Sequence, residues 1–394
     1  MNTKLLATDV QEYLSTMQTA SAAALALKKS PFEGISSKEI AQQVDGRQRA
    51  AKKIPAWTAV QGMYYPEKLN MEQCSSAETG QFKASLLHPG TRLIDLTGGF
   101  GVDSYYFARQ GAHVTHCEIN PSLSAIVQHN FKQLGLTQVT CVAGDGINYL
   151  KNLHDTSVII YIDPSRRVAQ QKVFRLADCE PNVVALQALF FEKATCVITK
   201  LAPLLDISLA LQQLEQVKDV YIISVDNDCK ELLFVQDKQY TGETKLHAIR
   251  LTGGKEQRFT CSIAEEQQAE AAYAAPEMYL YDPDVAITKA GAFKSVGATF
   301  GLSKLHQHTH LYTSSHYVAD FPGRCFRIQH VYPVSKLKKN AVLPKANIVA
   351  KNFPMRVEDI RKKFKIADGG SDFLYFCTLQ SGEHVAIHGV RFSA

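Results

Sequence analysis

A glycine-rich segment is the part of this chain whose residue types and spacing are best suited to binding a ligand. The apolar run 91–96 contains Asp95 near its end, and glycines follow at 98, 99 and 101 before a helix-like segment, 102–110. A strand that passes through a glycine loop into a helix directs backbone N–H groups and the positive helix end toward one pocket. Glycine permits this because no Cβ blocks the approach of the ligand. The sequence therefore predicts a nucleotide-type binding site.

Further acids follow the next apolar segments. Glu118 ends the segment 110–118, Asp145 ends 137–145, and Asp163 ends 157–163. The carboxyl ends of parallel strands meet at one edge of a sheet, and ligands bind at that edge in doubly wound folds. We therefore expect these acids and Asp95 along one edge. A carboxylate after the second strand can accept hydrogen bonds from both hydroxyls of a ribose.

Details of the loop indicate which nucleotide it binds. An NAD fingerprint that starts at Gly99 needs glycine at position 104, where serine stands. The loop instead resembles acid-x-Gly-x-Gly-x-Gly, the first motif of class I S-adenosylmethionine-dependent methyltransferases, with Thr97 in place of the first glycine. This resemblance implies S-adenosylmethionine as the cofactor and places Asp145 against its adenine amine. The expected cofactor-binding residues are Asp95, Thr97, Gly98, Gly99, Gly101, Glu118 and Asp145.

The fourth apolar segment leads into Asp163-Pro164, which resembles the start of the (Asp/Asn/Ser)-Pro-Pro-aromatic motif of amino methyltransferases. In that motif the side-chain oxygen and the proline carbonyl accept hydrogen bonds from the target N–H, so that the nitrogen lone pair faces the sulfonium methyl. Here Ser165 and Arg166 replace the second proline and the aromatic residue. RNA methyltransferases that act on uridine carbon need a cysteine after the fifth strand, where this chain has Leu201. Asp163 and Pro164 are therefore the predicted catalytic residues, for a non-covalent transfer to nitrogen.

The composition describes a globular protein of 394 residues, 45% hydrophobic and 21% charged. No apolar run approaches the ~18 residues of a membrane span, and the first residues lack a signal peptide, so no membrane partner is expected. Nine cysteines without a C-x-x-C pair favour a reducing cytoplasm. Histidines 306, 308 and 310 would share one face of a strand, but no neighbouring acid or cysteine completes a metal site, and no metal is expected.

Positive charge is concentrated at the end of the chain. Residues 323–394 contain 13 Lys and Arg against 5 Asp and Glu, whereas the whole chain carries a net charge of +5. Such a basic segment is typical of a protein with a polyanionic partner, although a solvated lysine-rich surface has the same composition. Arginines after the fourth strand can contact a phosphate or form salt bridges. The predicted RNA-binding residues are Arg166, Arg167, Lys336, Lys338, Lys339, Arg361, Lys362 and Lys363.

Four regions are expected along the chain. Residues 1–88 form a helical region whose lone tryptophan, Trp57, is a packing anchor. Residues 89–252 alternate strands and helices, as in a Rossmann-like α/β sheet that binds S-adenosylmethionine. Residues 252–255 and the Glu-, Ala- and Gln-rich residues 264–275 mark a linker. A small α+β segment covers 277–321, and a basic domain, 323–394, ends in a hairpin with a turn at Ser381-Gly382.

Several segments of the sequence resemble those of a bacterial family of class I methyltransferases that carry a small ferredoxin-like segment and a C-terminal THUMP-like domain. The similar segments are 72–76, 95–103, 163–167, 200–203 with Asp206, and 229–231. Because THUMP domains occur in RNA-modifying enzymes, the resemblance implies RNA as the partner. The sequence thus favours methylation of a base nitrogen in structured RNA, tRNA or rRNA. Methylation of a protein or small molecule, and a non-catalytic RNA-binding protein on a methyltransferase scaffold, are the alternatives.

Overall fold

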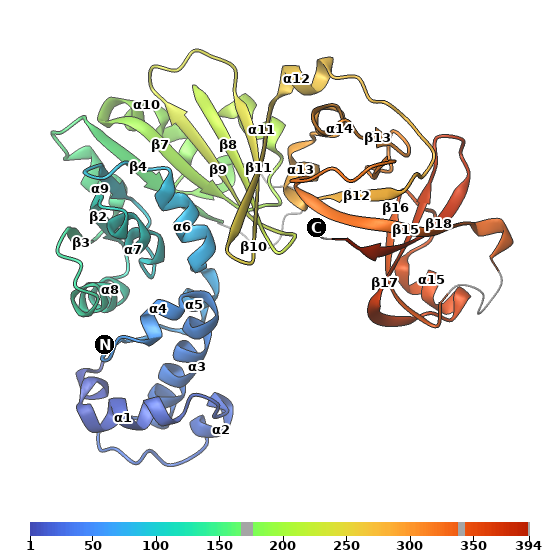
Figure 1. The fold of residues 1–394 in the computed structure, drawn as a ribbon. Coiled ribbons are helices and arrows are strands. Elements are labelled where there is room, and N and C mark those ends of the chain that lie inside the picture. Colours follow the sequence, from blue (N-terminus) through green and yellow to red (C-terminus); the bar gives the residue numbers. More distant parts are fainter. Residues whose placement is uncertain (167–175, 338–342, 393–394) are drawn as a thin grey trace. The chain divides into compact units, whose positions relative to one another are not determined.

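The computed structural model describes residues 1–166, 176–337 and 343–392 (Figure 1). The chain divides into two compact units. The first comprises Met1–Lys218 and Leu233–Gly242, and the second comprises Asp219–Leu232 and Glu243–Ala394. The chain therefore crosses between the units three times, and strand β9 (Asp228–Asp237) contributes to both.

The first unit begins with helices, as the sequence predicts. α3 starts with a capping box, in which Ser36 and Glu39 satisfy each other's backbone N–H groups. Trp57 is fully buried against the rings of Phe100 and Tyr105, so its predicted role as a packing anchor is confirmed. These helices therefore share one core with the sheet that follows. The helices are α1 (Thr8–Thr16), α2 (Ala22–Ala26), α3 (Ser37–Lys53), α4 (Pro55–Thr58), α5 (Lys68–Gln73) and α6 (Ala77–Ser85), after a 3-10 turn at Thr3–Leu6.

A sheet with strand order β9-β7-β4-β1-β2-β3 forms the rest of this unit. β1, β2, β3, β4 and β7 are parallel. Its central strand β4 is a continuous apolar run, Val-Ile-Ile-Tyr-Ile, because a parallel sheet is covered on both faces. The strands are β1 (Arg92–Asp95), β2 (His113–Glu118), β3 (Val139–Ala143), β4 (Val158–Ile162) and β7 (Ala194–Leu201), and the helices are α7 (Val102–Arg109), α8 (Pro121–Gln133), α9 (Gly146–Lys151), α10 (Val183–Lys193) and α11 (Ile207–Gln213).

The direction of the strand order reverses beside β1. The chain adds β2 and β3 on one side of β1 and then returns to place β4 on the other side. In doubly wound sheets such a switch point leaves a crevice at the carboxyl ends of the two strands, where ligands bind. The residues that follow β1 and β4 are therefore brought to the same crevice. Past β4 the chain adds the short strands β5 (Ser165–Arg166) and β6 (Cys179–Glu180) and the 3-10 turn η2 (Leu176–Asp178).

The second unit contains strands in the order β11-β10-β8-β9, formed with β8 (Val217–Val225), β10 (Lys245–Thr252) and β11 (Lys255–Ser262). β10 and β11 are an antiparallel pair in which Thr252 lies opposite Lys255. Gly253 and Gly254, both with positive φ, make the tight turn between them. The expectation that residues 252–255 belong to a linker is therefore wrong, because the glycines form the turn of a hairpin. α12 (Ile263–Gln268) follows β11.

A seven-stranded sheet, in the order β13-β14-β12-β15-β18-β17-β16, completes this unit. The predicted hairpin is confirmed, since β17 and β18 pair on either side of the turn at Ser381-Gly382. α15 buries Ile360 and Phe364 in a core with Phe376. The elements are β12 (Tyr279–Pro283), α13 (Val285–Ala290), α14 (Ser295–Phe300), β13 (Ser303–Lys304), β14 (Tyr312–Ser314), β15 (Gly323–Pro333), η3 (Val334–Lys336), β16 (Lys345–Lys351), α15 (Val357–Phe364), β17 (Ala367–Thr378) and β18 (His384–Arg391).

The three neighbouring histidines do not lie on a strand, and that expectation is wrong. Residues 306–310 form a turn between β13 and β14, in which the backbone N–H of His308 donates to Nδ1 of His306. His310 stacks on Phe293 with ring centroids 3.7 Å apart. Within the described ranges, no three His, Cys, Asp or Glu side chains converge as metal ligands would. None of the described helices combines the length and apolarity needed to cross a bilayer.

Candidate active site

The glycine loop after β1 has the backbone geometry that its sequence requires. Gly101 has φ +78° and caps the start of α7, and a Cβ there would strike Phe131 and Val127. A Cβ on Gly98 would overlap the ring of His116, which is buried on β2. Gly99 has φ +55°, and the atom nearest to a Cβ there would be the Thr97 carbonyl oxygen at 3.9 Å. The loop is therefore tightly packed beneath Gly98 and Gly101 and has room for a ligand beside Gly99.

Asp95 lies beneath this loop. Its side chain is 1% exposed and accepts hydrogen bonds from Ser104 Oγ at 2.7 Å and from the Thr97 backbone N–H at 3.2 Å. Burial raises the pKa of Asp95 to about 7, and the hydrogen bonds from Ser104 and Thr97 act in the opposite direction. Asp95 thus joins the loop to the first turn of α7.

Glu118 and Asp145 end the next two strand segments, and both also organise backbone. One Glu118 carboxylate oxygen accepts from the Gly99 N–H at 2.9 Å and the other from the Asn120 N–H at 2.7 Å. A carboxylate oxygen has more than one acceptor direction, so these bonds leave Glu118 able to accept from ribose hydroxyls. Asp145 is exposed and caps α9 by accepting from the Ile147 N–H at 2.7 Å.

Thr97 and Asp163 connect the loop to the end of β4. The Asp163 backbone N–H donates to the Thr97 hydroxyl at 2.7 Å, a bond that glycine at position 97 would not make. The Asp163 carboxylate accepts from Lys200 Nζ at 2.6 Å. Because Ile162 of β4 pairs with Thr199 of β7, Asp163 and Lys200 are the next residues on adjacent parallel strands. The side chain of Asp163 is 38% exposed and that of Lys200 is 13% exposed, so the carboxylate is the more accessible partner.

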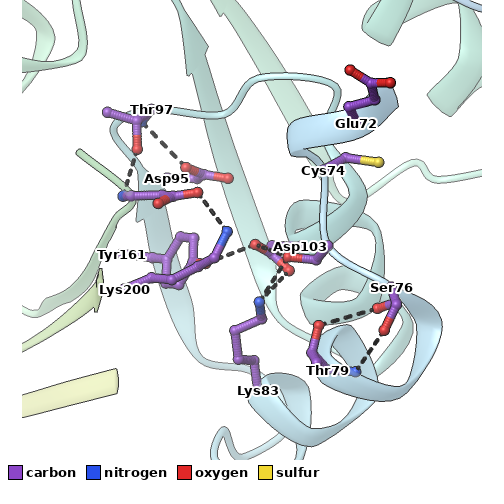
Figure 2. Close-up of polar contacts among 12 residues, drawn as sticks. Glu72, Cys74, Ser76, Thr79, Lys83, Asp95, Thr97, Asp103, Tyr161 and Lys200 are labelled. Carbon is purple, nitrogen blue, oxygen red and sulfur yellow. Dashed lines mark hydrogen bonds and ion pairs between the residues drawn. The ribbon is translucent and has the colours of Figure 1, made fainter. Parts of the chain in front are cut away.

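A second carboxylate, Asp103, holds a polar cluster beside this pair (Figure 2). Lys83 Nζ lies 2.9 Å from one oxygen, and the Tyr161 and Ser75 hydroxyls donate to the other at 2.7 and 3.0 Å. Lys83 also donates to Ser75 Oγ at 2.8 Å. Burial by itself raises the pKa of Asp103, but the positive charges of Lys83 and Lys200 and the hydrogen bonds outweigh it, so the pKa lies below its usual value. Asp103 is therefore held as a carboxylate.

The segment between α5 and α6 contributes Ser75 to this cluster and is held in place by hydrogen bonds. Lys53 Nζ donates to the carbonyl oxygens of Glu72 and Cys74 at 2.6 and 3.0 Å. Ser76 caps α6 by accepting from the Thr79 N–H. Figure 2 shows Glu72 in the last turn of α5 and Cys74 just after it. The helical region thus contributes Ser75 and Lys83 to the surroundings of Asp103.

The sequence did not identify Asp103, Lys83, Tyr161 or Lys200 as site residues. The sequence did contain a signal for Asp103 and Lys200, because both stand at the carboxyl edge of the predicted sheet. Asp103 follows Gly101 by two residues, and Lys200 lies at the end of the fifth strand. Lys83 had none, since a lysine in a helix is usually solvated, whereas this one is 1% exposed.

The predicted RNA-binding residues are divided between the two units. Arg166 ends the short strand β5 of the first unit, whereas Arg167, Lys338 and Lys339 lie outside the described residues. The other four belong to the second unit. Lys336 is exposed in η3, Lys362 and Lys363 are exposed on α15, and Arg361 forms an ion pair with Asp368.

Comparisons with known proteins agree with this architecture. Residues 279–322 match a family model described as a ferredoxin-like domain, and residues 323–391 match one described as THUMP domain-like. A crystal structure of a candidate methyltransferase from Porphyromonas gingivalis W83 is similar over 100% of this chain and 99% of its own, with a TM-score of 0.88 and 29% identity. In two strains of Mycobacterium tuberculosis, an uncharacterized S-adenosylmethionine-dependent methyltransferase is 24% identical over 265 residues, 66% of this chain and 69% of the relative.

The chain is a class I methyltransferase with a C-terminal THUMP-like domain. The family resemblance and the fold class expected from the sequence are therefore confirmed: a Rossmann-like sheet with a helical N-terminal region, a ferredoxin-like segment and a THUMP-like α+β domain. The glycine loop, with its open side at Gly99 and the Glu118 carboxylate next to it, suits the nucleoside part of the cofactor that such enzymes use.

Proposed function

We propose that this methyltransferase modifies a base nitrogen of a structured RNA, a tRNA or an rRNA. The observation that carries the proposal is the position of Asp163. Its partly exposed carboxylate stands at the switch point of the sheet, tied through its own N–H to the Thr97 hydroxyl of the glycine loop. A group that accepts hydrogen bonds from a target N–H is thereby fixed beside the cofactor-binding loop.

S-adenosylmethionine is the cofactor of this enzyme. When bound, it supplies a methyl group that its sulfonium activates for transfer to a nitrogen lone pair. In our proposal Glu118 accepts hydrogen bonds from the ribose hydroxyls, and Asp145 contacts the adenine amine. Gly98, Gly99 and Gly101 shape the loop. Asp95 holds the loop through hydrogen bonds to Thr97 and Ser104, and the Thr97 hydroxyl joins it to the Asp163 N–H after β4.

Asp163 and Pro164 position the target in this scheme. The Asp163 carboxylate and the Pro164 carbonyl accept hydrogen bonds from the N–H of the target, which turns the lone pair of that nitrogen toward the methyl donor. Little acid or base assistance is needed, so orientation supplies most of the rate, within the ~7–11 kcal/mol that orientation can contribute.

The basic second unit supports RNA as the substrate. Its THUMP-like match covers the residues in which the positive charge of the chain is concentrated, and clustered Lys and Arg bind phosphates. We assign RNA contacts to Lys336, Lys338, Lys339, Arg361, Lys362 and Lys363, and contacts with a phosphate near the target to Arg166 and Arg167. We also place the enzyme in the cytoplasm, because all nine cysteines are free and a reducing compartment keeps them so.

The test is transfer of labelled methyl from the cofactor to total RNA of a strain that lacks the gene, followed by mass spectrometry of the nucleosides. We expect one methylated base, and a loss of about 100-fold in Asp163→Ala with cofactor affinity unchanged in calorimetry. Asp9→Ala, at an exposed acid of α1, is the control and should transfer normally. Undiminished transfer by Asp163→Ala would refute the positioning role. RNA binding without cofactor binding would favour the scaffold alternative.

A further inference from the structure

The ion pair between Asp163 and Lys200 bears on which nitrogen the enzyme methylates. Lys200 Nζ lies 2.6 Å from Oδ2 of Asp163, and the lysine side chain is only 13% exposed. One carboxylate oxygen therefore accepts from the lysine, and the other is the oxygen to which the proposed function assigns the target N–H. The register of β4 and β7 fixes this pairing, since both residues directly follow the paired residues Ile162 and Thr199.

Lys200 lies close to two carboxylates, Asp163 and Asp103. It stands between two carboxylates, because its charge also helps to lower the pKa of Asp103, which Lys83 and Tyr161 hold from the other side. A substrate at Asp163 therefore meets an acceptor oxygen and a fixed positive charge next to each other.

This arrangement discriminates between kinds of nitrogen. A protonated amine, such as a lysine side chain or a polyamine, would meet two carboxylates whose charges Lys200 and Lys83 already compensate. It would therefore lose its hydration and lie next to the Lys200 ammonium without gaining a free counter-charge. A neutral N–H next to a carbonyl or imine atom suits both groups, since the N–H faces Asp163 and the electron-rich neighbour faces Lys200. Nucleobase edges present this H–N–C=O or H–N–C=N unit.

We infer that the Asp163–Lys200 pair selects a neutral nucleobase edge and rejects protonated amines, with Lys200 acting as a positioning residue for Asp163. This inference rests on the proposed function and narrows it to a class of target atom. Loss of Lys200 leaves the carboxylate without its fixed orientation and without the neighbouring charge. Loss of a hydrogen bond between charged groups then costs about 10- to 100-fold in kcat/KM.

The experiment compares Lys200→Met and Lys200→Arg with the native enzyme on total RNA of the deletion strain, measuring kcat, KM and cofactor affinity. Lys193→Met is the matched control, because Lys193 is buried to a similar degree (15% exposed) and bonds to the Leu153 carbonyl away from the site. We expect Lys200→Met to lower kcat/KM for RNA by about 10- to 100-fold, mainly through kcat, with cofactor affinity unchanged. Lys200→Arg should recover most of the rate, and Lys193→Met should match the native enzyme.

Two results would overturn the inference alone: native rates in Lys200→Met, or native enzyme that methylates poly-lysine or spermidine as readily as RNA. Native enzyme that transfers no methyl to RNA would instead refute the proposed function, so the two failures are distinguishable. Thermal unfolding of each variant shows whether it is folded. If Lys200→Met does not fold, Lys200→Arg still tests the pair, because it retains the positive charge.

Discussion

Asp103 shows how single side chains from distant segments build this site. Its partners are Ser75 from the segment before α6, Lys83 from α6 and Tyr161 from β4. Breaking a buried ion pair by removing one partner is far more costly than losing a surface pair, because it leaves a charge without compensation. The helical region and the sheet are therefore energetically coupled at this carboxylate.

His116 predicts a dependence of stability on pH. The ring is fully buried on β2 under Gly98, and burial lowers its pKa to about 4 from the 6.5 of an unperturbed histidine. Between these pH values the unfolded chain binds more protons than the folded one. The contribution of His116 to the free energy of unfolding is therefore complete above pH 6.5 and is lost as the pH falls toward 4. We expect a loss of ~2 kcal/mol from pH 7 to pH 5 through this residue.

Urea unfolding at pH 7 and pH 5 measures this contribution. His116→Leu should lose less stability over that interval than the native enzyme, by roughly the 2 kcal/mol that the histidine contributes. The exposed His154 provides the control, and His154→Asn should follow the native pH dependence. Equal pH dependence in the native enzyme and His116→Leu would contradict the argument.

The loop between β1 and α7 depends on glycine for two separate reasons, and a substitution can separate them. Gly101→Ala introduces a Cβ both at φ +78° and into contact with Phe131 and Val127. Gly135→Ala, after α8, faces a similar φ of +70° with no atom within 4 Å of the new Cβ. The backbone strain of about 1 kcal/mol is common to both variants, and only the first adds overpacking of about 1–3 kcal/mol.

We therefore expect Gly101→Ala to be less stable than Gly135→Ala in denaturant unfolding and to bind S-adenosylmethionine at least 10-fold more weakly in calorimetry, since α7 must shift. Gly135→Ala should bind the cofactor normally. Normal cofactor binding by a folded Gly101→Ala enzyme would show that the loop tolerates the displacement.

Elements with strong local signals were predictable, and contacts between them were not. The apolar runs that became β1, β2, β3 and β4 sit in a parallel sheet whose carboxyl edge carries Asp95, Glu118 and Asp163, as their spacing indicated. β11 was missed because it begins with four consecutive polar residues, Lys-Glu-Gln-Arg, after a Gly-Gly pair that resembles a linker. Lys83 was missed because only the tertiary fold decides that a helical lysine is buried against Asp103.

The two units divide the work that the proposed function requires. The first contains the glycine loop and Asp163, and the second contains most of the excess positive charge. On α15, Arg361 is partly neutralised by Asp368, whereas Lys362 and Lys363 are exposed. If these two lysines contact RNA phosphates, their effect must appear in binding and its salt dependence and not in the chemistry of transfer.

Lys362→Glu/Lys363→Glu should therefore bind RNA more weakly, with a plot of log affinity against log salt concentration less steep by about 1–2, because each lost phosphate contact removes about 0.7–0.9 from the slope. The rate at saturating RNA should stay at the native value. Lys28→Glu/Lys29→Glu, at two exposed adjacent lysines of the helical region, matches the change in net charge and should leave the slope unchanged.

If both double variants weakened binding equally, the attraction would come from overall charge and the THUMP-like domain would not be the RNA-binding surface. A selective effect on the slope would instead place the phosphate contacts on α15.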